Sequence, residues 1–152
     1  MKRHRTEIQV RFADTDALGH INNAVYATYA ELGRVEFMRA LGIEPGGFIL
    51  ARLALDYRRQ VRLGERVSVE TWVERVGNTS ITMRQVVLAG GGAGAAVATA
   101  AAPEGAAAVA TAVATAVAAE VEAVAVTFDY ATNGPVRVPD RMRELFRSWQ
   151  EG

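Results

Sequence analysis

One stretch of the chain carries most of its structural information: Val10-Arg11-Phe12-Ala13-Asp14-Thr15-Asp16-Ala17-Leu18-Gly19-His20-Ile21-Asn22-Asn23-Ala24-Val25-Tyr26. Residues 7–12, which lead into this stretch, alternate apolar and polar side chains, and this is the period of a half-buried strand. The middle is rich in Asp, Thr, Gly and Asn, which turn chains and cap helices. The stretch therefore predicts a strand, then a loop, then a helix that begins near Asn22.

The expected helix covers about residues 22–41, where apolar side chains recur every three or four positions. Gly33 falls inside this apolar stripe, at a cost of roughly 1 kcal/mol in helix propensity. Because glycine has no side chain, the helix axis can come close to whatever it packs on, and a sheet is the expected partner. Gly42 is the expected end of the helix.

Strand-like runs dominate most of the remaining sequence. They cover residues 48–61, 65–76, 79–88 and 121–130. After the last run, Asp140 is placed to cap a short helix that reaches Phe146. One long helix among successive strands predicts the α+β class, with the helix against a largely antiparallel sheet.

A low-complexity segment of Ala, Gly, Val and Thr occupies about residues 90–118. Two interpretations stay open. In the first, residues 103–105 form a turn and the flanking alternation of Val and Thr extends a hairpin. In the second, the alanines form an inserted helix or a loop. Residues 1–152 are treated as one domain, and this segment as an accessory insertion.

The charge balance argues against nucleic-acid and membrane partners, because 17 basic side chains offset 17 acidic ones. Cysteine is absent, which excludes disulfides, thiolate nucleophiles and cysteine-ligated metal. The charged first residues lack the apolar segment of a secretory signal, so a cytoplasmic protein is expected. No convincing metal-ligand spacing or phosphate-binding loop occurs, so neither a metal nor a cofactor is expected.

Two aspartates before a helix, such as Asp14 and Asp16, are by themselves typical turn formers or caps. The whole phrase, followed by Tyr29-Ala30-Glu31 and Arg34, closely resembles the opening of 4-hydroxybenzoyl-CoA-thioesterase-like proteins, which are hotdog-fold acyl-CoA thioesterases. The resemblance resumes at residues 119–139 and fails at about 90–118. It implies a long central helix wrapped by a five- to six-stranded antiparallel sheet, in a homodimer or homotetramer.

The resemblance also implies a catalytic pair. Asp16 matches the family's catalytic carboxylate, as nucleophile or general base, and Asn23 matches the position whose backbone N–H polarises the thioester carbonyl. Thioester hydrolysis needs both parts: a group that attacks or activates water, and a donor where negative charge develops. A helix N-terminus supplies unsatisfied N–H groups and a favourable dipole.

Three neighbours are candidate substrate-binding residues, each with a plainer alternative: His20, Asn22 and Tyr26. The histidine either orients Asp16 or makes a local structural bond, Asn22 either contacts substrate or caps the helix, and Tyr26 either lines a pocket or belongs to the core. A basic cluster, Arg58, Arg59 and Arg62, could meet coenzyme A phosphates, but solvation of a cationic strand edge is the favoured explanation, and the cluster is left out of the expected site.

Together these features predict hydrolysis of an acyl-CoA to a carboxylic acid and coenzyme A. The alternative is a hotdog module that binds acyl-CoA without turning it over. Asp16 discriminates between the two, because a binding module does not need a carboxylate at the start of the helix.

Overall fold

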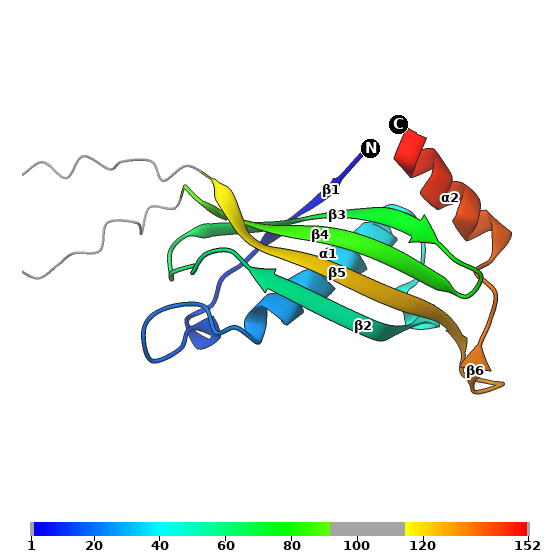
Figure 1. Cartoon of the computed structure of the whole chain (residues 1–152), viewed down its shortest axis with the longest axis horizontal. Helices are drawn as coiled ribbons and strands as arrows, with labels where there is room; N and C mark the ends of the chain where they lie inside the picture. Colours follow the sequence, from blue (N-terminus) through cyan, green and yellow to red (C-terminus); the bar gives the residue numbers. More distant parts are fainter. Residues whose placement is uncertain (1, 92–114, 152) are drawn as a thin grey trace, which may run out of the picture.

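The computed structural model describes residues 2–91 and 115–151 (Figure 1). Its elements are β1 (His4–Ile8), the 3-10 turn η1 (Phe12–Asp14), α1 (Val25–Ala40), η2 (Pro45–Gly47), β2 (Phe48–Tyr57), β3 (Arg66–Val76), β4 (Ser80–Gly90), β5 (Ala116–Asp129), β6 (Gly134–Pro135) and α2 (Asp140–Glu151). The strand order is β1-β3-β4-β5-β2, with β6 paired to β5. Every pairing is antiparallel, and α1 lies across one face of the sheet. The predicted α+β hotdog arrangement is confirmed.

The close approach of α1 to the sheet depends on Gly33. A β-carbon built at this position would lie 2.7 Å from Val69 Cγ1 and 3.0 Å from Gln85 Nε2, both on sheet residues. No larger side chain fits without moving a strand residue. The helix ends as expected, because Gly42 takes the left-handed conformation at φ +68°.

Two groups of buried side chains form the core between helix and sheet. One lies under the first half of α1 and includes Tyr26, Tyr29 and Val69. The other lies under its second half and under α2, and includes Phe37 and Phe146. Since the first group also contains Ile21, the loop that precedes α1 is fixed to the core.

The first strand is shorter than its alternation predicts. It ends at Ile8, and Phe12 is 81% exposed in the turn η1 rather than buried in a strand. The side chain of Asp14 accepts a 2.9 Å hydrogen bond from the backbone N–H of Arg11, so this group is not available to a strand ladder. Sequence alternation alone could not reveal that competition.

Other boundaries also differ from those expected. The strand β2 stops at Tyr57 rather than at Val61, since the N–H groups of Arg58 and Arg59 both turn to the carbonyl of Ala118. In the opposite direction, β5 begins at residue 116, so residues 116–118 belong to the sheet rather than to the insertion. The final helix is longer than expected and reaches residue 151. The expected turn at residues 103–105 lies outside the described residues.

No helix in the described parts of the chain is long and apolar enough to span a membrane.

Candidate active site

The loop between β1 and α1 is held by a buried carboxylate, that of Asp14. This residue is 1% exposed and accepts hydrogen bonds from Arg11 Nη2 at 2.8 Å and from the Tyr29 hydroxyl at 2.9 Å. Its backbone carbonyl accepts the N–H of Asn22 at 2.9 Å. The hydrogen bond from Arg11 is the main cause that lowers the pKa of Asp14. Asp14 is therefore a support of the loop, as expected from the sequence.

Asp16 lies farther along the same loop and is only partly buried. Its Oδ1 accepts the backbone N–H of Leu18 at 2.8 Å and that of His20 at 3.1 Å. Gly19 closes this turn with φ +75°, a conformation that favours glycine. Within the described residues nothing donates to Oδ2, so one carboxylate oxygen is anchored and the other is available.

Asn23 precedes α1 by two residues, instead of lying in its first turn as expected. A tight turn precedes the helix, which therefore begins only at Val25. In this turn the N–H of Val25 donates to the carbonyl of Asn22 at 2.9 Å, and the N–H of Ala24 donates to Asn22 Oδ1 at 2.9 Å. The Asn23 carbonyl accepts the hydroxyl of Tyr57 at 2.9 Å. Its own N–H donates to no residue of the described chain, and so it is available to a ligand.

A cavity of about 220 Å³ brings the predicted site residues together. It is lined by Asp16, His20, Asn23 and Tyr26 from the loop and helix, and by Tyr57, Arg58 and Arg59 from the end of β2. Asn22 does not line the cavity and instead caps the turn before α1. Four of the five predicted residues thus share one hollow, and the fifth supports it.

Tyr26 is both a core residue and a wall of the cavity. It is buried, and burial raises the pKa of its phenol. Its ring packs edge-on against Tyr57, with centroids 5.2 Å apart and planes at 88°. Tyr57 is a site residue that sequence reasoning missed, because only the pairing of β2 places it beside the helix start.

The wall of this cavity that follows the end of β2 is basic. Its two arginines, however, are already paired with acidic side chains. Arg58 forms an ion pair with Glu120, and Arg59 Nη2 contacts Glu65 Oε2 at 2.6 Å. Burial alone would raise the pKa of Glu65, but the hydrogen bonds from Arg59 and from the backbone N–H of Arg62 lower it overall. This wall joins the loop between β1 and α1 through the backbone bridge between His20 and Arg62.

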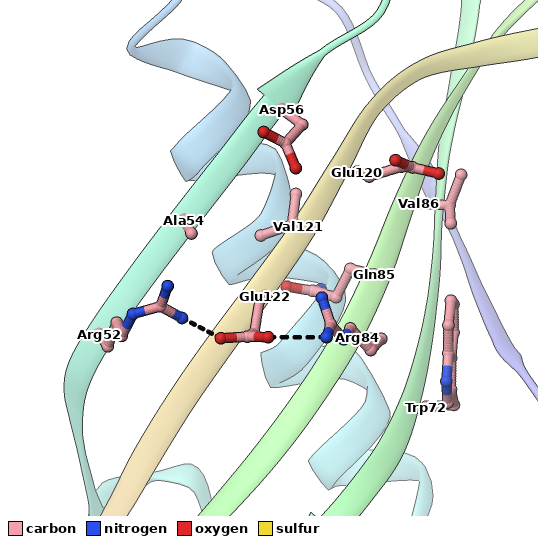
Figure 2. Close-up of a pocket in the computed structure, with 10 residues that line it drawn as sticks. All are labelled: Arg52, Ala54, Asp56, Trp72, Arg84, Gln85, Val86, Glu120, Val121 and Glu122. Carbon is pink, nitrogen blue, oxygen red and sulfur yellow. Dashed lines mark hydrogen bonds and ion pairs between the residues drawn. The ribbon is translucent and has the colours of Figure 1, made fainter.

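A larger hollow, of about 340 Å³, lies on the face of the sheet away from α1 (Figure 2). Glu122 stands between two arginines there and pairs with both Arg52 and Arg84. Trp72 borders the same hollow. Its central charges neutralise one another, and it contains no residue predicted for the site, so it is not the candidate active site.

The antiparallel sheet around one long helix defines a hotdog-fold protein. At the start of that helix lie a carboxylate and a backbone N–H that donates to none of the described residues. The family model described as "Thioesterase superfamily" matches residues 18–96, more than half of the 152 residues. The chain belongs to the thioesterase superfamily, and the family resemblance of its sequence is confirmed.

The similarity to individual relatives is low and covers only part of each chain. The chain is 32% identical over 91 residues to "Acyl-acyl carrier protein thioesterase ATL2, chloroplastic" of Arabidopsis thaliana, covering 55% of this chain and 48% of that protein. It is 31% identical over 77 residues to "Putative acyl-CoA thioesterase YneP" of Bacillus subtilis (strain 168), covering 46% and 56%. The chain spans about half the length of the curated relatives it matches.

One solved structure is similar over almost its whole length. It is a thioesterase from Thermus thermophilus complexed with coenzyme A and Zn, 29% identical, with a TM-score of 0.74. The similarity covers 97% of this chain and 94% of that one.

Proposed function

We propose that this chain hydrolyses an acyl-CoA thioester to a free carboxylic acid and coenzyme A. The observation that carries the proposal is the shared cavity, in which the available oxygen of Asp16 and the available N–H of Asn23 belong to lining residues. Membership of the thioesterase superfamily supports the same reaction.

The two groups have complementary roles in this reaction. Asp16 either attacks the thioester carbon, forming an anhydride that water then opens, or takes a proton from the water that attacks. In both routes the carbonyl oxygen gains negative charge, and the N–H of Asn23 stabilises that charge by a hydrogen bond. The C–S bond breaks, and the coenzyme A thiolate leaves and is protonated. The two hydrogen bonds on Oδ1 of Asp16 hold the carboxylate in place for either role.

The remaining site residues position the substrate. His20 and Tyr26 line the cavity, and we assign them to contact with the thioester. Asn22 acts indirectly, because its side chain holds the turn that presents the N–H of Asn23. Arg58 and Arg59 line the same cavity, and we assign them to the phosphates of coenzyme A, for which a guanidinium is a suitable donor. Such a contact would have to compete with their ion pairs to Glu120 and Glu65. The related Thermus structure, which contains coenzyme A, supports this choice of ligand.

We further propose a homodimer formed through β2. This strand is at one edge of the sheet, so its outer N–H and C=O groups have no strand partner among the described residues. Leu32, Ile49 and Leu50 are exposed apolar side chains on α1 and β2. Pairing with a second copy would cover the edge and the side chains of Ile49 and Leu50, which belong to β2.

The test is release of free coenzyme A thiol from acetyl, medium-chain, long-chain and aromatic CoA esters. An acyl carrier protein thioester belongs in the same panel, since one relative is named for that substrate. We expect turnover of at least one ester by the parent protein and its loss in Asp16→Asn. Tight binding of esters without turnover of any would overturn the proposal and favour an acyl-CoA-binding module.

A further inference from the structure

The start of α1 is joined to the end of β2 by two tyrosines (Figure 1). The hydroxyl of Tyr57, the last residue of β2, donates a 2.9 Å hydrogen bond to the backbone carbonyl of Asn23. In the opposite direction, the hydroxyl of Tyr26 donates to the backbone carbonyl of Arg59 over a longer distance of 3.4 Å. Each tyrosine thus bonds to the backbone of the segment that carries the other.

The Tyr57 hydroxyl is presented from a rigid support. The backbone of Tyr57 pairs with Ala119 of β5, and the N–H groups of the next two residues both donate to the carbonyl of Ala118. Its ring packs edge-on against the ring of Tyr26, which is buried in the core. Since the backbone and the ring are both held, the hydroxyl has a fixed position relative to the sheet.

The peptide group that carries the N–H of Asn23 has hydrogen bonds on both sides. Its own carbonyl, that of Asn22, accepts the N–H of Val25 at 2.9 Å and so closes the turn. In the next peptide group the N–H of Ala24 donates to Asn22 Oδ1 at 2.9 Å, and the carbonyl accepts the Tyr57 hydroxyl. The first two of these bonds lie within the turn, whereas the third comes from the sheet. The bond from Tyr57 therefore places the turn relative to β2.

The placement of this N–H matters for the reaction proposed above, because a donor stabilises a developing oxyanion only at hydrogen-bond distance and in the right direction. A displacement of about 1 Å in a reacting group can lower a rate by about a hundredfold. Asp16 is held separately, since the N–H groups of Leu18 and His20 donate to its Oδ1. The distance between the two proposed catalytic groups thus depends on how firmly the turn at Asn23 is held.

We propose that Tyr57 is a positioning residue for this hydrolysis, an inference that rests on the proposed function. Its hydroxyl holds the turn in the position that directs the N–H of Asn23 at the thioester carbonyl. Tyr57 acts through Asn23 rather than on the substrate, because its proton is engaged by the Asn23 carbonyl. The proposal is compatible with a dimer through β2, since all of these bonds lie within one chain.

Tyr57→Phe tests the proposal, because phenylalanine keeps the packing on Tyr26 and removes only the hydroxyl. We expect kcat for acyl-CoA hydrolysis to fall about tenfold, the effect of one lost hydrogen bond, with KM within about twofold of the parent. Tyr130→Phe, at an exposed tyrosine outside the cavity, is the control and should leave both constants unchanged.

A double variant separates positioning from a general loosening of the fold. Asn23→Pro removes the N–H itself, so in that background Tyr57→Phe has no N–H left to misplace. We expect the kcat values of Asn23→Pro and of the double variant to agree within about twofold. A purely structural effect would instead lower kcat about tenfold in both backgrounds.

The turn can also be observed without turnover, by ¹⁵N NMR relaxation. The order parameters of the Asn23 and Ala24 amides should be near the rigid value of about 0.85 in the parent and fall towards about 0.6 in Tyr57→Phe. The amide of Phe37, in the second half of α1, should be unchanged and serves as the internal reference.

Four outcomes would overturn the role of Tyr57 and leave the hydrolysis in place. The first is a kcat of Tyr57→Phe equal to that of the parent, and the second is a rise in KM without a loss of kcat. The third is an equal loss of kcat in the Asn23→Pro background, and the fourth is an unchanged order parameter at Asn23. Absence of hydrolysis by the parent protein would overturn the proposed function, and this role of Tyr57 with it.

Discussion

The hydroxyl of Tyr29, on α1, donates a 2.9 Å hydrogen bond to the carboxylate of Asp14, fifteen residues earlier in the chain. Both side chains are buried, so this bond fastens the loop between β1 and α1 to the central helix. Burial, and next the bond to Asp14, raise the pKa of Tyr29, and the phenol remains a donor. The same carboxylate also holds Arg11. Asp14 thus ties the first part of the loop to α1, and its backbone carbonyl accepts the N–H of Asn22 near the end of the loop.

We expect Tyr29→Phe to lower the free energy of unfolding by about 1.5–3 kcal/mol, since it removes a buried hydrogen bond to a charged group. Denaturant unfolding measures the change. Tyr130→Phe is the matched control, because Tyr130 is exposed and should change stability by less than about 0.5 kcal/mol.

The same network predicts a pH dependence. The folded pKa of Asp14 is lowered, so its stabilising contribution is present above the unfolded value of about 3.9 and is lost as pH falls through the folded value. Asp14→Asn should therefore have a much lower free energy of unfolding than the parent at neutral pH. The difference between the two proteins should become smaller in acid. A difference in the free energy of unfolding that stays constant from neutral pH to about pH 2 would contradict a stabilising role of the Asp14 carboxylate.

Gly33→Ala tests the close approach of helix and sheet. Alanine favours a helix over glycine by about 1 kcal/mol, so propensity alone predicts stabilisation. The new β-carbon, however, would lie 2.7 Å from Val69 Cγ1. We expect a net loss of about 1–3 kcal/mol by denaturant unfolding. Thr28→Ala, at an exposed position of the same helix, should cost little, and equal effects of the two changes would refute the packing argument.

The predictions about Gly33 and Asp14 show what the sequence could and could not reveal about the fold. Periodicity predicted α1 and the role of Gly33, because a repeat along sixteen helical residues is a strong local signal. It failed at Phe12, which lies in a turn where the side chain of Asp14 accepts the N–H of Arg11. A boundary that depends on one polar contact does not change the periodicity of the sequence, so periodicity cannot predict it.

Some residues of the candidate site could likewise be predicted from the sequence, and others could not. The loop motif and the start of α1 are continuous in sequence, so Asp16, His20, Asn23 and Tyr26 could be predicted to lie close together. Tyr57 comes from the end of β2, and its position depends on strand pairing between distant segments. The delay of the helix start beyond Asn23 depends on the turn before α1, which the motif does not specify.

Leu50→Lys tests the proposed dimer. Leu50 is an apolar residue of the edge strand β2 that is 45% exposed, and pairing of β2 with a second copy, with the two central helices side by side, would cover it. A charge there should convert a dimer at micromolar concentration into a monomer, as measured by light scattering. Leu63→Lys, at 41% exposure in the turn before β3, is the control and should leave the mass unchanged. A monomeric parent protein would disprove the dimer itself.

Asp16→Asn should reduce kcat for acyl-CoA hydrolysis by at least about a hundredfold. The amide oxygen can still accept the hydrogen bonds of Leu18 and His20, so the loop and the KM should change little. What is lost is the anionic oxygen needed for attack or proton abstraction. Asp56→Asn, in β2 and outside the cavity, is the matched carboxylate control. Full activity of Asp16→Asn would remove the central claim about the mechanism.

The final prediction isolates the backbone N–H of Asn23. This residue is the second of the four turn residues 22–25, a position that accepts proline without distortion. Asn23→Pro therefore keeps the turn while removing the N–H, and kcat should fall by about 10²–10³. Asn23→Ala removes only the side chain, so it should keep activity within a fewfold of the parent. An unchanged melting temperature of Asn23→Pro would show that the turn is intact. Equal activity of the two variants would mean that another donor stabilises the carbonyl oxygen.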